Sequence, residues 1–400
     1  METVSAEVVV VGGGPAGLTS AIALAEAGIK TALVSARPRS PDNRTTALLA
    51  GSVQALTTLG VWDICRTQAA PLQVLRIIDD TRRLLRAPEV CFDAREIGLD
   101  AFGFNIENGH LIAAMETRAR GLPALALVAD EAVEVVVEHE KITVECNGAS
   151  IEARLVIGAD GRNSLCRSAA AIARDSRRYP QTALTFNIRH SRPHGDAATE
   201  FHTQAGPFTL VPLPGLRSSL VFVVDPTEAP RLAALSDVEI SAEIERRSHS
   251  ILGRLEVEPG RGVFPLVVEV ARAFGAHRAV LIGEAAHVLP PIGAQGLNLG
   301  LRDAATIAEL AVAAHRDGRD PGSPELTARY EHMRRADVMS RSLAVDLLNR
   351  SLLSDFLPWQ AARGLGLFLT ERLAPLRRAA MREGIAPAAS QPRLMRGEAL

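Results

Sequence analysis

Hydrophobic positions follow their most regular pattern near the start of the chain. Residues 8–11 are four consecutive valines without polar alternation, which is typical of a strand covered on both faces in a parallel sheet. From Ala16 onward, apolar residues recur at helical spacing until Gly28 ends the pattern. Residues 31–34 are again apolar and predict a second strand. The opening of the chain therefore predicts a β-α-β unit.

The middle of the chain has a different pattern. Short apolar runs separated by Pro, Gly and Asp turns fill residues 73–104 and 182–224 and predict an antiparallel sheet inserted into an α/β scaffold. Residues 155–157 and 280–282 predict further buried strands. Helical spacing returns at residues 301–316 and 325–350, with a turn-rich break at 318–324. The predicted fold class is α/β, with α+β character in the insertions.

Composition excludes several function classes. The 400 residues carry 44 basic and 46 acidic side chains, so the net charge of −2 gives no general attraction to nucleic acid. Lys30 and Lys141 are the only lysines, so the chain has no Gly-Lys-Ser/Thr phosphate loop. A Schiff-base enzyme would have to use one of these two residues. A local binding site for a small ligand is not excluded by the composition.

Metal sites and membrane segments are not predicted. The four cysteines form no Cys-x-x-Cys pair, so neither a zinc site nor a redox disulfide is expected. His190 and His194 have helical spacing, but Pro193 between them disfavours a helical metal face. The long uncharged stretch at residues 8–25 contains glycines and a proline and lacks a preceding basic segment. We therefore expect a cytoplasmic protein with reduced thiols.

A glycine-rich turn follows the first predicted strand. Gly12, Gly14 and Gly17 form a G-x-G-x-x-G motif with a strand before it and a helix after it, as a dinucleotide-binding turn requires. The free N–H groups at the start of the helix would face the phosphates. Ser35 ends the second strand, where an acidic residue normally binds the ribose hydroxyls. A dinucleotide is predicted, with an adenosine that is bound more loosely or is bound by Ser35 together with Arg37.

Two further strand-to-turn segments distinguish flavin from nicotinamide. Residues 155–164 run from a strand into a Gly-Asp-Gly turn, and residues 280–287 end a strand in small residues. The second of these continues through a glycine-rich segment, residues 290–300, into a helix. Three such turns in this order, separated by β-rich insertions, carry more information than any one of them alone.

These segments resemble those of flavin-dependent aromatic monooxygenases that share the p-hydroxybenzoate hydroxylase fold. The chain is most similar to the ubiquinone-biosynthesis hydroxylase family, and the resemblance covers nearly its whole length. Other stretches similar to that family are residues 42–48, 59–62, 104–111, 206–219 and 295–303. The last, Q-G-L-N-L-G-L-R-D, is the most specific.

The resemblance implies a division of the chain. It implies a Rossmann-like FAD-binding domain, an interleaved antiparallel β-sheet domain for the substrate, and C-terminal helices. The FAD-binding domain would be discontinuous, formed by residues 1–70, 106–175 and 276–330. Residues 71–105 and 176–275 would form the substrate domain, and residues 331–400 the helical segment.

The resemblance also implies FAD as cofactor and NAD(P)H as a transient electron donor. Arg44 would reach the cofactor, Asp160 would lie at a turn used by both nucleotides, and Glu284 replaces the family's usual Asp beside the ribityl chain. Pro290 stands where relatives often have His, and His287 is interpreted as structural. The predicted cofactor-binding set is Gly12, Gly14, Pro15, Ala16, Gly17, Ser35, Arg44, Asp160, Gly283, Glu284, Gly293, Gln295, Gly296, Leu297 and Asn298.

The implied reaction is hydroxylation of an aromatic ring through a flavin C4a-hydroperoxide, with O2 as co-substrate and a polyprenylated phenol of ubiquinone biosynthesis as substrate. A proton acceptor near the phenol would help, and His190, His202, a backbone carbonyl and water all remain open. No catalytic side chain is predicted. The expected wall over the flavin ring is Thr185, Asn187, Phe201, Leu210, Val221 and Val223.

Two other functions share these turns: a flavin-dependent reductase of isoprenoid double bonds, and a non-catalytic scaffold that binds FAD or prenyl groups. The C-terminal apolar run from Leu343 to Leu369 is expected to pack on the flavin domain. Its alternative is peripheral contact with the inner membrane face or with a partner in a biosynthetic complex.

Overall fold

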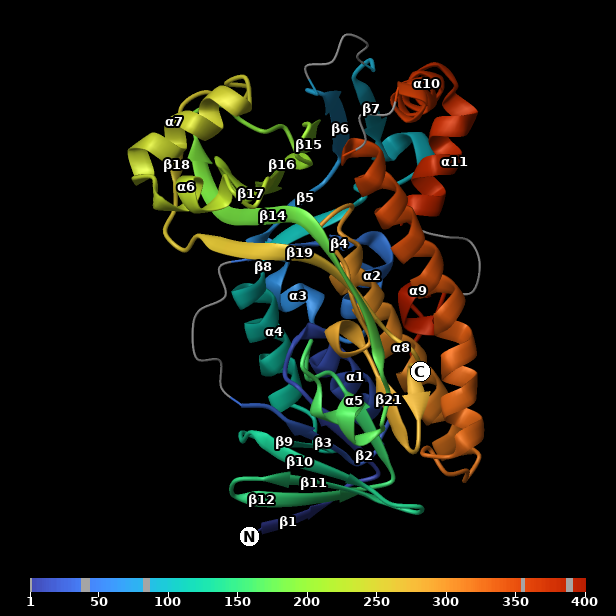
Figure 1. Ribbon diagram of the computed structural model, residues 1–400. Helices are drawn as coiled ribbons and strands as arrows, with labels where there is room; N and C mark the ends of the chain where they lie inside the picture. Colours follow the sequence, from blue (N-terminus) through green and yellow to red (C-terminus); the bar gives the residue numbers. More distant parts are fainter. Residues whose placement is uncertain (1, 37–43, 82–86, 354–356, 386–390) are drawn as a thin grey trace.

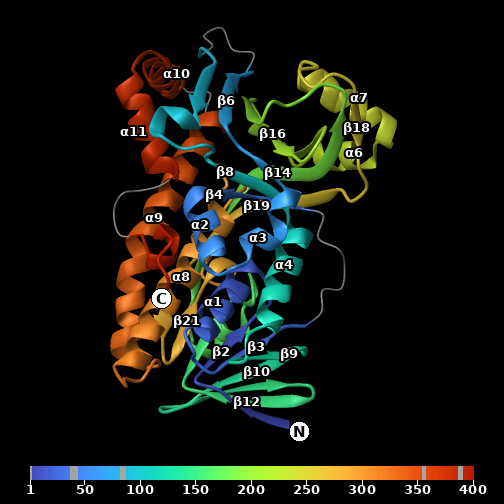
Figure 2. The ribbon, with the colours of Figure 1, turned by 180° about the vertical axis from the view of Figure 1, so that it is seen from behind.

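The computed structural model describes residues 2–36, 44–81, 87–353, 357–385 and 391–400. Asp42 and Asn43, at the start of the similar stretch 42–48, lie outside these residues, as does Phe356 of the C-terminal apolar run. The molecule is elongated, with the N-terminus at one end, a large sheet at the other and helix α9 along one side (Figures 1 and 2).

A six-stranded sheet organises the lower half of the molecule. Its order is β20-β21-β13-β2-β3-β9, and every neighbouring pair is parallel except β20 with β21. The four valines of β2 are at most 4% exposed, because α1 and the strand β12 of a neighbouring sheet pack against β2. The predicted β-α-β unit is confirmed. The bounds are β2 (Val8–Val11), α1 (Pro15–Glu26), β3 (Thr31–Val34), β9 (Leu125–Val128), β13 (Leu155–Gly158), β20 (Gly275–Ala276), β21 (Ala279–Leu281) and α8 (Gln295–Arg316).

A small sheet of order β1-β12-β11-β10 closes this end of the molecule (Figure 1). Its strands are β1 (Glu2–Ser5), β10 (Ala132–Val137), β11 (Ile142–Cys146) and β12 (Ala149–Ala153). Further helical elements of the molecule are α3 (Trp62–Cys65), η1 (Arg66–Gln68), α4 (Asn108–Arg120), α5 (Leu165–Ala169), η3 (Gly283–Ala285) and η4 (Arg393–Arg396).

The upper half is built on a nine-stranded sheet. Its order is β22-β19-β14-β17-β16-β15-β6-β7, with β18 beside β14. Helices α6 and α7 pack against one of its faces through an apolar cluster that includes Leu232, Ile240 and Phe222. The bounds are β6 (Val74–Asp79), β7 (Val90–Asp93), η2 (Ala94–Ile97), β14 (Arg174–His190), β15 (Ala197–His202), β16 (Pro207–Leu213), β17 (Arg217–Val224), α6 (Ala229–Ala234), α7 (Asp237–Arg247), β18 (Leu255–Val257), β19 (Gly262–Ala271) and β22 (His287–Val288).

One pair in this sheet departs from the predicted antiparallel pattern. Strand β6 pairs with β15 in parallel, while β6 with β7 and β15 with β16 are antiparallel. Parallel neighbours need a long crossover connection. The chain between β6 and β15 passes through the lower half of the molecule and provides one.

A three-stranded sheet joins the two halves. Its order is β4-β8-β5, formed by β4 (Thr45–Leu49), β5 (Ala69–Pro71) and β8 (Gly103–Glu107), and α2 (Ala50–Thr58) follows β4.

The C-terminal part is helical, as predicted. It consists of α9 (Pro324–Leu353), α10 (Leu357–Arg372) and α11 (Ala374–Ile385). Within the described ranges, no helix is both long enough and apolar enough to cross a membrane.

Candidate cofactor and substrate site

The first glycine turn leaves room for a ligand at one point and none at two others. A Cβ on Gly12 would lie 2.2 Å from the carbonyl oxygen of Ala159, and Gly12 has φ of +114°. A Cβ on Gly17 would lie 1.9 Å from the carbonyl oxygen of Gly12. Gly14 differs, because a Cβ there would meet no atom within 4 Å. The backbone at Gly14 therefore borders open space beside the start of α1.

Gly13, an unassigned position of the motif, also has to lack a side chain. A Cβ on Gly13 would lie 2.0 Å from the hydroxyl oxygen of Ser35. Ser35 is thus placed directly against the turn, at the end of β3. The contact explains why both positions carry small residues.

Helix α1 begins at this turn without a capping side chain. Gly14 is the N-cap, no side chain of the described residues bonds to it, and the first helical residue is Pro15. The early N–H groups of a helix, here including those of Ala16 and Gly17, have no partner within it and attract anions. The observed geometry fits a diphosphate.

The second turn lies against the first. Asp160 follows Ala159, and its Oδ2 accepts a hydrogen bond from the Cys166 amide at 3.1 Å. Its Oδ1 is buried and has no hydrogen-bond partner among the described residues. Buried carboxylate oxygens normally accept a hydrogen bond. The hydroxyl group of a bound ligand could donate one to Asp160 Oδ1.

Arg167, for which the sequence predicted no role, links the second glycine-rich turn to the third by hydrogen bonds. Its guanidinium donates hydrogen bonds to the carbonyl oxygens of Arg162 and Ala285, at 2.8 and 2.9 Å. The side chain is buried, and this burial lowers the pKa of Arg167. The sequence offers only its position after the second turn as a signal.

The third turn packs on the start of α1. Gly283 has φ of +56°, and a Cβ there would lie 3.3 Å from the Cβ of Ala16. A Cβ on Gly300 of α8 would come within 3.1 Å of the Gly283 Cα. Glu284 is exposed at this turn. The three glycine-rich turns therefore converge around the N-terminus of α1.

The start of α8 forms a second helix N-terminus that lacks a capping side chain. Gly293 and Ala294 have positive φ values of +64° and +54°, and Ala294 is the N-cap. Gln295 donates from Nε2 to the Gly293 carbonyl at 2.9 Å and accepts from Arg341 at 3.0 Å. A Cβ on Gly296 would meet no atom within 4 Å. This end of the helix is open and would favour negative charge.

Asn298 holds this segment in place. Its Oδ1 accepts from the Leu49 amide at 2.8 Å and from the Ser52 hydroxyl at 2.7 Å. Its Nδ2 donates to the carbonyl oxygens of Ala47 and Ala294, at 2.8 and 2.6 Å. The carboxamide uses all these bonds to join α8 to β4 and α2. Leu297 beside it is half-buried and packs against the core.

A buried ionic cluster fixes the third turn from behind. Asp303 accepts hydrogen bonds from the Gly283 amide (3.1 Å), His287 Nε2 (2.7 Å) and Arg334 Nε (2.7 Å). Burial raises the pKa of Asp303, but His287 and Arg334 outweigh this effect, so its pKa lies below the ordinary value. These contacts give His287 a structural role.

Arg44 lies directly before β4 and contacts the nine-stranded sheet. The Arg44 guanidinium carbon lies 5.7 Å from the centre of the Phe264 ring in β19, and Arg44 is exposed.

Strand β8 connects these cofactor segments to the large sheet. Asn105 donates from Nδ2 to the Pro212 carbonyl at 2.9 Å and to the Ser219 hydroxyl at 3.1 Å. Asn187 of β14 donates to Glu107 at 3.1 Å. Since β8 pairs with β4, which Asn298 holds, one face of the nine-stranded sheet is directed at the start of α8. We call it the inner face.

Two residues of the expected ring wall lie on the opposite, outer face. The register pairs Thr185 with Val221, and Asn187 with Ser219, on the inner face. Phe201 pairs with Phe208 and Leu210 with Leu220 on the outer face, where all four belong to the apolar cluster under α6 and α7. The assignment of Phe201 and Leu210 to the wall was wrong, whereas Thr185, Asn187, Val221 and Val223 do share one face.

His190 and His202, the two histidines considered as proton acceptors, lie on opposite faces of the nine-stranded sheet. His190 belongs to the outer face, where its Nε2 lies 3.0 Å from the Ser218 hydroxyl and its Nδ1 lies 2.8 Å from the Arg192 carbonyl. Burial lowers the pKa of His190. His202 belongs to the inner face, because it is two residues from Glu200, which pairs with Thr209.

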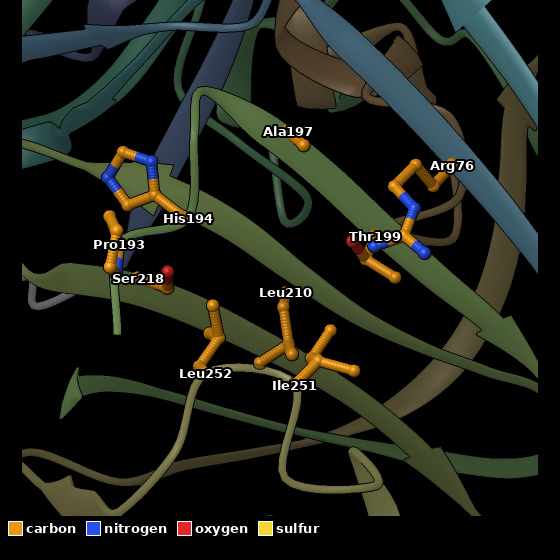
Figure 3. A pocket seen from close by; sticks show the side chains of 9 residues that line it. All are labelled: Arg76, Pro193, His194, Ala197, Thr199, Leu210, Ser218, Ile251 and Leu252. Carbon is orange, nitrogen blue, oxygen red and sulfur yellow. The ribbon is translucent and has the colours of Figure 1, made fainter. Parts of the chain in front are cut away.

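A cavity of about 70 Å³ opens on the outer face (Figure 3). It is lined by Arg76, Pro193, His194, Ala197, Thr199, Leu210, Ser218, Ile251 and Leu252. The sheet separates it from the cofactor segments, so it is not the substrate site of a cofactor bound there.

Comparisons with known proteins agree with this arrangement. A family model described as FAD binding domain matches residues 5–342. Ubiquinone hydroxylase UbiL of Rhodospirillum rubrum is 36% identical, with 98% of this chain and 93% of that protein covered. The 3-demethoxyubiquinol 3-hydroxylase of Escherichia coli is 31% identical, with 94% and 97% covered.

Solved structures show the same fold. p-Nitrophenol 4-monooxygenase PnpA from Pseudomonas putida DLL-E4 superposes with a TM-score of 0.78 at 22% identity, covering 98% of this chain and 100% of that one. Klebsiella pneumoniae R204Q HpxO complexed with FAD gives 0.74 at 19% identity, with 95% and 98% covered.

The fold, the three converging turns and the two open helix N-termini define an FAD-dependent monooxygenase. The chain belongs to the FAD binding domain family, in the branch that includes the ubiquinone hydroxylases. The predicted fold class, FAD cofactor and enzyme class are thereby confirmed.

Proposed function

We propose that this protein hydroxylates the aromatic ring of a polyprenylated phenol in ubiquinone biosynthesis, with O2 as co-substrate and NAD(P)H as the transient electron donor. The names of two relatives that match over nearly their whole lengths support this substrate class. They give no support to a reductase of isoprenoid double bonds or to a non-catalytic scaffold.

The observation that carries the proposal is the pair of helix N-termini without capping side chains at the two ends of one cofactor path. The diphosphate of FAD would lie beside Gly14, Pro15, Ala16 and Gly17. A Cβ on Gly14 would meet no atom there, and the early N–H groups of α1, those of Ala16 and Gly17, have no partner within the helix. Asp160 Oδ1 would accept from the cofactor. Gly12 and Gly283 would allow the ends of β2 and β21 to lie close to the cofactor.

The start of α8 would hold the isoalloxazine ring. When FAD is bound, its reduced ring supplies the activation of dioxygen. Backbone N–H groups from Gln295 to Leu297 would stabilise negative charge on that ring through the helix dipole. Asn298 acts through its four hydrogen bonds and is a positioning residue, not a cofactor ligand by its side chain.

The remaining assignments follow from this path. Ser35, Arg44, Glu284 and Gly293 would border the cofactor at its adenosine, diphosphate, ribityl and ring portions. The FAD-binding domain would comprise residues 1–70, 106–175 and 276–330, the substrate domain residues 71–105 and 176–275, and the helical segment residues 331–400.

We also propose peripheral contact between the C-terminal helices and the inner membrane face. Residues 339–385 carry seven arginines and four acidic residues, in contrast to the net charge of −2 of the chain. Of these arginines, Arg350, Arg372, Arg378 and Arg382 are exposed, which suits contact with anionic lipid. The large apolar side chains exposed on α9, α10 and α11 and at the junction of the last two are Met339, Leu343, Leu347, Leu348, Leu365, Phe368, Leu373 and Leu376.

Vesicle flotation tests this contact. The wild-type protein should float with vesicles that contain anionic phospholipid, and the double variant Leu343→Glu, Leu347→Glu should not. Val238→Glu is the control, because Val238 is 81% exposed on α7, away from these helices. Equal flotation of all three proteins, or of none, would contradict the proposal.

Deletion of the gene tests the substrate. Mass spectrometry of accumulated quinone precursors should show a polyprenylated ring that lacks one hydroxyl group, and its structure identifies the carbon attacked. An unchanged quinone pool would refute the proposed substrate.

A further inference from the structure

We propose that the carboxylate of Glu200 accepts a hydrogen bond from the ring hydroxyl of the substrate, and that His202 positions this carboxylate. The inference rests on the proposed function, since it concerns how an aromatic substrate is held for hydroxylation. It starts from one row of side chains on the inner face of the large sheet.

The row runs across five strands. The register pairs Glu200 with Thr209, Thr209 with Val221, Val221 with Thr185, and Thr185 with Gly262. Register partners point to the same face of a sheet. Since Thr185 and Asn187 are two residues apart in β14, this row shares its face with the side chain that bonds to Glu107 of β8.

The row is more accessible than its inner-face neighbours in β14 and β17. All five of its members are half-buried. On one side of it, Asn187 and Ser219 are buried beneath β8. On the other, Ala183 and Val223 are buried in a cluster with Tyr179, near α9. In β14 and β17 the row is therefore the accessible part of the inner face, between the residues beneath β8 and those near α9.

Glu200 is the one ionisable member of this row. Its Oε1 lies 2.9 Å from His202 Nε2, and its Oε2 accepts from the Thr209 hydroxyl at 3.3 Å. A carboxylate has about four acceptor positions, so each oxygen can accept a further bond. The Glu200 side chain is 14% exposed and that of His202 only 3%. The Glu200 carboxylate is therefore the more accessible of the two groups, and the buried His202 imidazole contacts it from the interior of the protein.

Among the described contacts, Glu200 is the acid that bonds to His202. Asp79 faces it across the β15–β6 pair, but its oxygens accept bonds from Thr81 and the Ala87 amide. His202 Nδ1 is buried and has no hydrogen-bond partner in the described chain. Donation from Nε2 to Glu200 thus places the ring proton on Nε2, which orients the carboxylate.

The chemistry suits an aromatic hydroxylase. Hydrogen bonds to an ionised carboxylate are roughly twice as strong as neutral ones. A phenol that donates to Glu200 gains electron density in its ring, which favours attack on an electrophilic oxygen. His190 is not available for this role, since both of its nitrogens are engaged on the outer face.

The test compares 2-geranylphenol with its methyl ether, which cannot donate. Binding of each to the FAD-loaded enzyme is followed by the change in flavin absorbance. A net charged hydrogen bond of about 1.5–3 kcal/mol predicts a roughly 10- to 100-fold preference for the phenol in the wild type. Glu200→Gln, which keeps the shape, should lower the preference to about threefold or less. His202→Asn should reduce it by an intermediate factor.

His190→Asn is the matched control on the outer face and should leave the preference unchanged. Circular dichroism and FAD content establish that each variant is folded. A Glu200→Gln protein that is folded, binds FAD and keeps the full preference would overturn the inference. Failure of the wild type to hydroxylate 2-geranylphenol would instead count against the proposed function, and the binding comparison would still test Glu200.

Discussion

Replacement of Asn298 by alanine tests how the segment at the start of α8 is held. The carboxamide is 3% exposed and makes four hydrogen bonds, to Leu49, Ser52, Ala47 and Ala294. With about 1 kcal/mol for each net bond, Asn298→Ala should lower the free energy of unfolding by about 4 kcal/mol. Ser52→Ala removes only one of these bonds, so its loss should be about 1 kcal/mol.

Urea unfolding of the FAD-free proteins, followed by far-ultraviolet circular dichroism, measures both losses. The FAD dissociation constant should also rise in Asn298→Ala, because the carbonyl of Ala294 at the proposed ring site loses its donor. A loss below about 1 kcal/mol in Asn298→Ala, with unchanged FAD affinity, would refute the positioning role assigned to this residue.

Three further outcomes follow from the structure. Gly14→Ala should weaken FAD binding and lower the unfolding free energy by no more than about 1 kcal/mol, because its methyl group meets no protein atom yet fills the proposed diphosphate approach. Gly109→Ala, also in open space but within α4, should leave FAD binding unchanged and raise the unfolding free energy by up to about 1 kcal/mol. Burial raises the pKa of Asp337, but Arg334 and Arg302 outweigh this effect and hold its pKa below the ordinary value of 3.8. The ion pairs of Asp337 therefore stabilise the fold above that pH and are lost as the pH falls. The difference in unfolding free energy between the wild type and Asp337→Asn should therefore be largest near pH 7 and shrink progressively as the pH falls below about 4, and a constant difference would contradict this. Under native conditions an alkylating reagent should modify Cys91 first, as judged by peptide mass spectrometry, because the other thiols are buried and burial raises the pKa of Cys65 to about 11; earlier modification of Cys65 would contradict the burial.

The nucleotide-binding half could be predicted because its constraints are local. A strand of four valines needs cover on both faces, and Gly12 and Gly17 have backbone atoms about 2 Å from where a Cβ would be. Such positions tolerate only glycine, so the turn is visible in the sequence itself.

The faces of the large sheet could not be predicted in the same way. Strand β17 has Val221 on the inner face and Phe222 on the outer one, so apolar residues occur on both and the alternation gives no direction. Phe201 and Leu210 were therefore assigned to the wrong face. Only the register and the position of α6 and α7 distinguish the two faces.

Long-range contacts account for the rest. The partners of Asn298 in β4 and α2 are about 250 positions away in the sequence, and Arg334 reaches Asp303 from a different helix. Hydrophobic periodicity carries no information on such pairs. The roles of Asn298, Asp303 and Arg167 consequently appear only when the three segments are brought together.

Isotope labelling tests the central claim most directly. Purified protein is reconstituted with FAD and supplied with NADH, 2-geranylphenol and 18O2, and the product is analysed by mass spectrometry. The account predicts a phenol with one added hydroxyl group whose oxygen carries the label. Oxidation of NADH without a hydroxylated product, or a product oxygen derived from water, would contradict it.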